Sequence, residues 1–141
     1  MAGKRYYWVK LMCDFFEQPN IMLLENEENG REYVLFYLKL LLKSIRTDGI
    51  TNIGELRLNK SVAYTDDMLA KVTHTDIDVA KSAIDILIRY GMLSKTSDGT
   101  YYLPEAGNLV GSETEDAQRK RESRQKKETS SSGIENDEWN Y

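Results

Sequence analysis

Hydrophobic residues along the first hundred positions recur at spacings that predict mostly helices. The strongest pattern covers Arg31–Arg46 (REYVLFYLKLLLKSIR), where ten of sixteen residues are apolar and the polar ones fall along one stripe. A helix of this composition has little surface left for water, so it is either the central helix of the domain or partly covered by a second subunit. Asp48-Gly49 would end it.

Two more helices and a hairpin are predicted further along the chain. Thr65–Asp67 supplies the start of a short helix, and Thr75 is placed to cap a longer one that runs to Tyr90 with apolar residues three and four positions apart. Gly91 would stop this longer helix. Asp98-Gly99 then lies between two strand-forming runs, which is a strong hairpin signal.

Extended segments surround these helices. Lys4–Leu11 (KRYYWVKL) predicts an extended segment packed on both sides, and Asn20 is placed to cap a short helix over Ile21–Leu24. Ile50–Leu58 predicts a weak strand interrupted by Gly54. The order helix, strand, helix, helix and hairpin is typical of a winged helix-turn-helix, in which the hairpin is the wing. We therefore expect a mainly α fold of the α+β class, with an N-terminal extension and a charged C-terminal tail.

The composition changes after residue 107. Residues 111–141 contain four apolar side chains, too few for a core of their own. Ser112–Glu115 has the spacing of a capping box, which predicts a charged helix over Glu113–Lys127, and Thr129–Tyr141 is predicted to be disordered. The expected organisation is a winged-helix domain over residues 1–107, a linker and basic charged helix over 108–128, and a disordered tail over 129–141.

The net charge of the 141-residue chain is −4, from 19 lysines and arginines against 23 aspartates and glutamates. This balance excludes a protein whose whole surface binds polyanions. Residues 118–128 are nevertheless basic, with six bases and two acids, although such a segment also suits a solubilising linker. The helix expected over Thr75–Tyr90 has three acids and two bases among its polar residues, which disfavours it as a reader of duplex DNA.

Basic residues beside aromatic ones are the candidates for nucleic-acid contact. Tyr101 belongs with them because a wing aromatic stacks on unpaired bases in some proteins, although packing across the hairpin is its commoner role. The candidate DNA-binding residues are Lys4, Arg5, Lys81, Arg89, Lys95, Tyr101, Arg119, Lys120, Arg121, Arg124, Lys126 and Lys127.

The chain has few residues suited to catalysis. Cys13 is its single cysteine and His74 its single histidine, so neither an internal disulfide nor a cluster of cysteine and histidine metal ligands is expected. Cys13 is interpreted as a small buried hydrophobe and His74 as part of a helix-connecting turn. Phosphate-binding glycine motifs are missing, and no apolar run approaches the ~20 residues that span a bilayer. We expect a soluble intracellular protein without enzymatic activity, cofactor or metal.

Three segments carry a resemblance to a known family. KRYYWVKLMCDFF at 4–16, YVLFYLKLLLKSI at 33–45 and LIRYGMLS at 87–94 resemble the N-terminal domain of phage replisome organiser proteins. The resemblance implies a DnaD-like winged helix that binds origin DNA and helps to recruit the host replicative helicase or its loader, in the cytoplasm of a bacterial host. It also implies self-association, for which the candidates are Tyr6, Trp8, Tyr33, Phe36 and Tyr37.

Two other functions remain open beside a replication initiator. One is a winged-helix scaffold for protein assembly without sequence-specific DNA binding, and the other is a phage transcription regulator. Two features depart from the family pattern. The loop Glu25–Gly30 is acidic, and the family pattern would place a larger C-terminal region beyond Tyr141. The second departure leads us to expect a shortened organiser.

Overall fold

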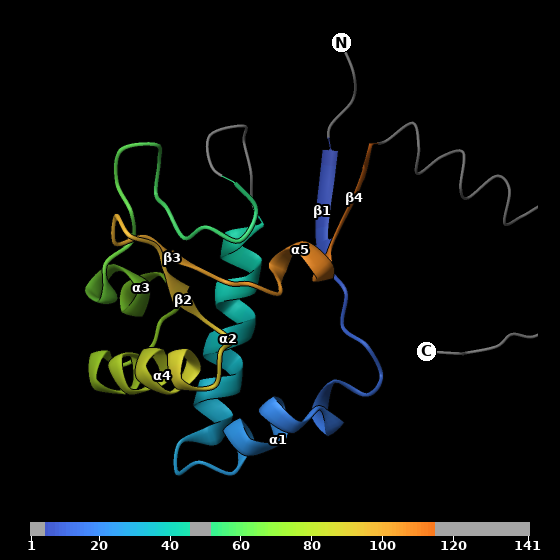
Figure 1. Ribbon diagram of the computed structural model, residues 1–141, viewed down its shortest axis with the longest axis vertical. Coiled ribbons are helices and arrows are strands. Elements are labelled where there is room, and N and C mark those ends of the chain that lie inside the picture. Colours follow the sequence, from blue (N-terminus) through green and yellow to red (C-terminus); the bar gives the residue numbers. More distant parts are fainter. Residues whose placement is uncertain (1–4, 46–51, 115–141) are drawn as a thin grey trace, which may run out of the picture.

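The computed structural model describes residues 5–45 and 52–114 of the chain (Figure 1). These residues form helices and two small antiparallel sheets, which confirms the expected mixture of helix and strand. None of the described helices is long and apolar enough to cross a membrane. The elements in chain order are β1 (Arg5–Val9), η1 (Phe15–Glu17), α1 (Pro19–Glu25), α2 (Gly30–Ser44), α3 (Asp66–Val72), α4 (Ile77–Arg89), β2 (Ser94–Lys95), β3 (Tyr101–Tyr102), α5 (Ala106–Leu109) and β4 (Val110–Thr114).

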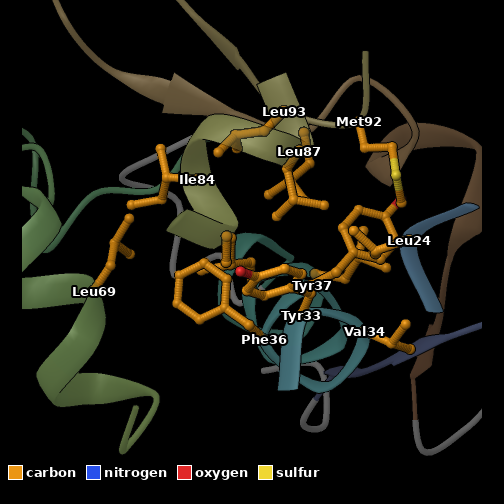
Figure 2. Close-up of a cluster of buried hydrophobic side chains, with 14 of the residues drawn as sticks. Leu24, Tyr33, Val34, Phe36, Tyr37, Leu69, Ile84, Leu87, Met92 and Leu93 are labelled. Atoms are coloured by element: carbon orange, nitrogen blue, oxygen red, sulfur yellow. The ribbon is translucent and has the colours of Figure 1, made fainter. Parts of the chain in front are cut away.

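Helix α2 is the centre of the core, and it packs against α1 and α4. Figure 2 shows its aromatic residues Tyr33, Phe36 and Tyr37 in one cluster with Leu24 of α1 and Leu87 of α4. Fully burying a large apolar side chain contributes roughly 1.5–3 kcal/mol, so this contact fixes the position of the helix. The interpretation of α2 as the central helix of the domain is confirmed.

The start of α3 and the end of α4 lie at the expected signals. The Thr65 hydroxyl accepts a hydrogen bond from the Met68 N–H and caps α3. Helix α4 stops just before Gly91, which has φ +76°, a conformation that glycine adopts without steric cost. The predicted hairpin forms as the antiparallel pair β2 and β3.

The weak strand expected before α3 is present only as single bridges in the described residues. Glu55 bridges to Tyr102 of β3, and Arg57 bridges to Ala63. Gly54 interrupts the segment because it has φ +98° and lies against the Leu103 carbonyl, 3.1 Å from where a β-carbon would be. The Gly54 N–H also donates to the Ser44 carbonyl at 2.9 Å, which ties this segment to the end of α2.

A second sheet joins the two ends of the described chain. Strand β1 pairs antiparallel with β4, with Trp8 opposite Gly111, and the two strands stand beside α5 in Figure 1. Residues 108–114 therefore form the end of α5 and a strand, not the linker and first helical turn expected from the capping-box spacing. That signal is local, whereas the aromatic strand β1 finds its partner a hundred residues away.

Three local expectations are corrected. Asn20 does not cap α1: the helix starts at Pro19, whose fixed φ suits the first helical position, after the cap residue Gln18. Asp76, not Thr75, caps α4, through a 3.1 Å bond from the Asp78 N–H. Cys13 is exposed, because its segment is a surface connection between β1 and η1.

Several expectations lie outside the described residues. They are the turn at Asp48-Gly49, the candidate Lys4, the tail bases from Arg119 to Lys127, the helix beyond Thr114 and the disorder of 129–141.

Candidate nucleic-acid interface

A hydrogen bond connects the turn between α3 and α4 to α2. The Lys39 ammonium on α2 donates a 2.7 Å hydrogen bond to the Thr73 carbonyl at the end of α3. The negative end of the helix dipole lies there, so the positive charge of Lys39 is also stabilising. The buried Thr73 hydroxyl donates to the Leu69 carbonyl at 2.7 Å. His74 follows in the left-handed region with φ 54° and is exposed, as the sequence predicts for a turn residue.

Helix α4 buries one face and exposes a mixed one. Ala80, Ala83, Ile84 and Leu87 pack inward. The exposed face alternates acids and bases: Asp78, Lys81, Ser82, Asp85, Ile88 and Arg89. With phosphates, the acids of such a face oppose the attraction of its bases, so the helix has no net electrostatic preference for DNA.

The tip of the hairpin β2–β3 is cross-linked by one arginine. The Arg57 guanidinium donates to Asp98 Oδ2 at 3.1 Å, to the Thr100 hydroxyl at 2.8 Å and to the Lys60 carbonyl at 3.3 Å. It thus joins the loop after the Glu55 bridge to the hairpin turn, and its charge is already satisfied by protein groups.

Asp98 organises the same turn. The Thr96 hydroxyl, then the hydroxyl and N–H of Thr100, and the Arg57 guanidinium lower the pKa of the Asp98 carboxyl to about 2. Each of these groups stabilises the ionised form. The carboxylate is therefore charged across the physiological range and keeps the turn in one conformation.

The base of the hairpin is fastened to α3. The Tyr101 hydroxyl donates a 2.6 Å bond to Asp66 Oδ1, and its ring is 6% exposed. Burial first, then the Asp66 hydrogen bond and the charges of Asp66 and Asp85, raise the pKa of Tyr101. The Lys95 ammonium lies 4.8 Å from the ring centroid and is exposed. Tyr101 is therefore a packing residue, and its predicted role in stacking on bases is wrong, because its ring is covered by protein.

The structure brings together only some of the candidate bases. Lys81, Arg89 and Lys95 are exposed on α4 and β2, whereas Arg5 lies on β1 in the other sheet. Lys60 was missed in the sequence analysis. It is exposed, and it lies beside the hairpin tip, since Arg57 donates both to the Lys60 carbonyl and to Asp98 in the hairpin turn. Its position next to Asn59 and Ser61, both turn-forming residues, was the available signal.

Comparison with known protein families assigns residues 8–131 to the family described as the N-terminal phage replisome organiser. The chain belongs to this family. No curated protein and no solved structure matches it. The suspected resemblance is therefore confirmed, and the family supports a role of this organiser domain in phage DNA replication.

The residues expected to mediate self-association of the organiser domain divide into two groups. Tyr33, Phe36 and Tyr37 are between 1% and 7% exposed within a single chain, so they offer almost no outer surface to a second copy, and Tyr37 is reached only through a pocket that it lines. Their apolar character is explained by the core around α2. Tyr6 and Trp8 on β1 are 40% and 41% exposed and remain accessible. Self-association itself stays a prediction.

Proposed function

We propose that this protein is a non-enzymatic replication organiser that binds origin DNA through a wing and a basic C-terminal segment. The order α2, Glu55 bridge, α3, α4 and β2–β3 supports a winged helix-turn-helix with the hairpin as the wing. The observation that carries the proposal is the hairpin itself. Hydrogen bonds hold its tip to Arg57 and its base to Asp66, and Lys60 and Lys95 are exposed around it.

The proposal assigns the wing, and not α4, the main contact with DNA. Asp78 and Asp85 lie among the bases of α4, while Arg57 neutralises the one acid at the wing tip, Asp98. A rigid loop presenting lysines contacts phosphates without reading bases, which positions a protein on DNA without specifying sequence. Sequence preference would then arise from DNA shape or from assembly of several copies.

The basic residues 119–127 extend this contact in the proposal. They carry six bases, which would give a slope of log K against log salt of at most roughly −4 to −5 if each met a phosphate. Once bound in the cytoplasm of the bacterial host, the organiser would help to recruit the replicative helicase or its loader, as the family resemblance implies.

Charge reversal tests the wing contact. Lys60→Glu with Lys95→Glu should weaken binding of a duplex or single-stranded probe at least tenfold at moderate salt, because two phosphate contacts become repulsions. Arg31→Glu, an exposed base at the start of α2, is the matched control and should change binding little. Equal loss in both variants, or none in the double variant, would reject the wing as the contact surface.

A protein-assembly scaffold is the second candidate. It is favoured by Leu35 and Leu42, both 52% exposed and two turns apart on the outer face of α2. Sedimentation across micromolar concentrations distinguishes the two functions. A monomer at every concentration that still binds DNA firmly would exclude the scaffold.

A further inference from the structure

We propose that the surface around η1 and α1 binds a basic amphipathic segment of a partner protein, which inserts one aromatic side chain into a pocket beside Tyr37. This surface is distinct from the candidate nucleic-acid interface, since none of the residues that line the pocket belongs to α3, α4, β2 or β3. The inference does not depend on DNA binding.

The pocket lies between the start of α1, the middle of α2 and the α5 region. Its volume is about 370 Å³, near the lower end of the range for ligand sites. Phe15, Ile21 and Tyr37 are the buried lining residues, whereas Lys10 and Glu105 are exposed and form part of the rim. One large side chain fits such a space better than an extended ligand does.

A buried hydroxyl lines this pocket without a hydrogen-bond partner among the described residues. Tyr37 is 3% exposed, and burial, followed by the Glu105 carboxylate that also lines the pocket, raises the pKa of Tyr37 to about 12. The phenol is therefore protonated at neutral pH. Leaving a buried O–H unpaired is costly, so an occupant that brings a polar atom to it relieves that cost.

Exposed apolar side chains are concentrated in the segment that supplies much of the pocket lining, and one of them, Met12, lines the pocket itself. Five of the thirteen large hydrophobic side chains that are exposed in the described residues lie within residues 11–23. This concentration in one short segment is typical of a surface that a protein partner covers. The five side chains, between 39% and 57% exposed, are Leu11, Met12, Phe16, Met22 and Leu23.

Charge identifies the class of partner. Residues 11–30 contain five acids and no lysine or arginine, and of these acids Glu27 is engaged by the Tyr90 hydroxyl at 2.6 Å. Lys10 on the rim of the pocket is offset by Glu105, so these acids leave the surface with a net negative charge, which repels DNA and complements a cationic segment. The acids are Asp14, Glu17, Glu25, Glu27 and Glu28.

The lining of the pocket indicates which aromatic side chain of the partner would enter it. Phe15, Ile21 and the Tyr37 ring provide apolar walls, and the Tyr37 hydroxyl provides one polar contact. Tyrosine and tryptophan combine a large apolar ring with one polar atom, and such residues dominate the energy of protein interfaces. An amphipathic helix that places lysines or arginines beside this aromatic side chain would match both the pocket and the acids of the neighbouring segment.

The experiment pans a random peptide library displayed on phage against the full chain, and in parallel against the double variant Glu17→Lys with Leu23→Asp. Both positions are exposed, so the double variant keeps the fold. The expected result is enrichment on the unmodified chain alone of peptides with net positive charge and a tryptophan or tyrosine. Equal enrichment on both chains, or enriched peptides that are neutral or acidic, would overturn the proposal.

A synthetic copy of the most enriched peptide then locates the site. Its binding should shift the amide NMR signals of Met12, Gln18 and Leu109, and alanine at its aromatic position should weaken it at least tenfold. Leu42→Asp with Glu32→Lys on α2 is the matched control and should leave the affinity unchanged. Signals shifted only on α4 or the hairpin, or no effect of the alanine change, would contradict the assignment.

Two further probes separate other occupants. A peptide of residues 116–128 of this chain is basic but has no large apolar side chain, and a twelve-nucleotide single strand is anionic. Neither should displace the selected peptide. Displacement by the first would assign the surface to the chain's own tail, and displacement by the second would assign it to DNA; either result overturns the proposal.

Discussion

The Tyr101 hydroxyl and the Asp66 carboxylate are 2.6 Å apart, and this hydrogen bond fastens the hairpin to the first residue of α3. It links the hairpin to α3 across thirty-five positions of sequence. Because the hairpin strands are only two residues long, their own pairing is weak, and contacts of this kind decide whether the hairpin is rigid.

Removing that hydroxyl should loosen the hairpin. Tyr101→Phe keeps the buried ring but leaves Asp66 without its donor, which should lower the free energy of unfolding by about 1–3 kcal/mol, as for hydrogen bonds to charged groups. Thermal and urea unfolding measure the loss. Tyr102→Phe, on the neighbouring half-buried position, is the control, and an equal loss there would contradict the role given to the Asp66 bond.

Lys39 should matter for the helix pair more than its place on a polar stripe suggests. Lys39→Met keeps the aliphatic stem and removes the ammonium that bonds the Thr73 carbonyl at 2.7 Å. We expect a loss of about 1–2 kcal/mol and faster amide hydrogen exchange at Thr73 and Thr75. Lys43→Met on the same helix is the comparison. If the two variants exchange alike, Lys39 does not hold the turn.

The Asp98 carboxyl should titrate far below a free aspartate. Its pKa is lowered from 3.8 to about 2, chiefly by the Thr96 hydroxyl, so its stabilising effect on the turn is complete above pH 3.8 and is lost as the pH falls towards 2. Carboxyl NMR titration should show the low value, and Thr96→Val should raise it. A value near 3.8 in the unmodified protein would refute the arrangement of the turn.

The opposite limit of pH tests Tyr37. Its pKa is raised from 10.0 to about 12, so the folded state favours the neutral phenol. The stability it contributes is complete below pH 10 and is lost as the pH rises from 10 to 12. Urea unfolding between pH 9 and 12 should show this decline, and Tyr37→Phe should make it shallower. An unchanged slope would mean that the Tyr37 hydroxyl is not buried.

Gly111 should report on the pairing of β1 with β4. A β-carbon at this position would overlap the Trp8 indole, while one at Gly107 would meet nothing within 4 Å. Because Trp8 is 41% exposed, its ring can swing outward, so Gly111→Ala should change tryptophan fluorescence more than stability. A Trp139→Phe background isolates the signal from Trp8, and Gly107→Ala is the control. Identical spectra for both alanine variants would argue against this strand pair.

Much of the helical part was predictable because its signals are local. The hydroxyl of Thr65, the positive φ of Gly91 and the Asp98-Gly99 turn act on their immediate neighbours, and all three mark the boundaries seen in the structure. Strand β4 was not predictable in this way. Ser112 and Glu115 have capping-box spacing, but Ser112 pairs with Tyr7 of β1, and the strand pairing includes Thr114.

The candidate site was predicted less well than the fold. The positions of Lys81, Arg89 and Lys95 on an exposed surface follow from helix and hairpin patterns. The direction of the Tyr101 side chain cannot be predicted from such patterns, since a two-residue strand has no alternation to distinguish the buried face from the exposed one. Pairing partners such as Arg57 with Asp98 are set by tertiary contacts, and no spacing in the sequence indicates them.

NMR mapping of a DNA complex tests the central claim most directly, because it shows which face of the organiser domain meets the duplex. The account predicts that amide signals of Lys60, Lys95 and Gly99 move most on titration with DNA at moderate salt, while those of Asp78 and Asp85 on α4 move little. Shifts concentrated along α4, with the wing unaffected, would contradict it.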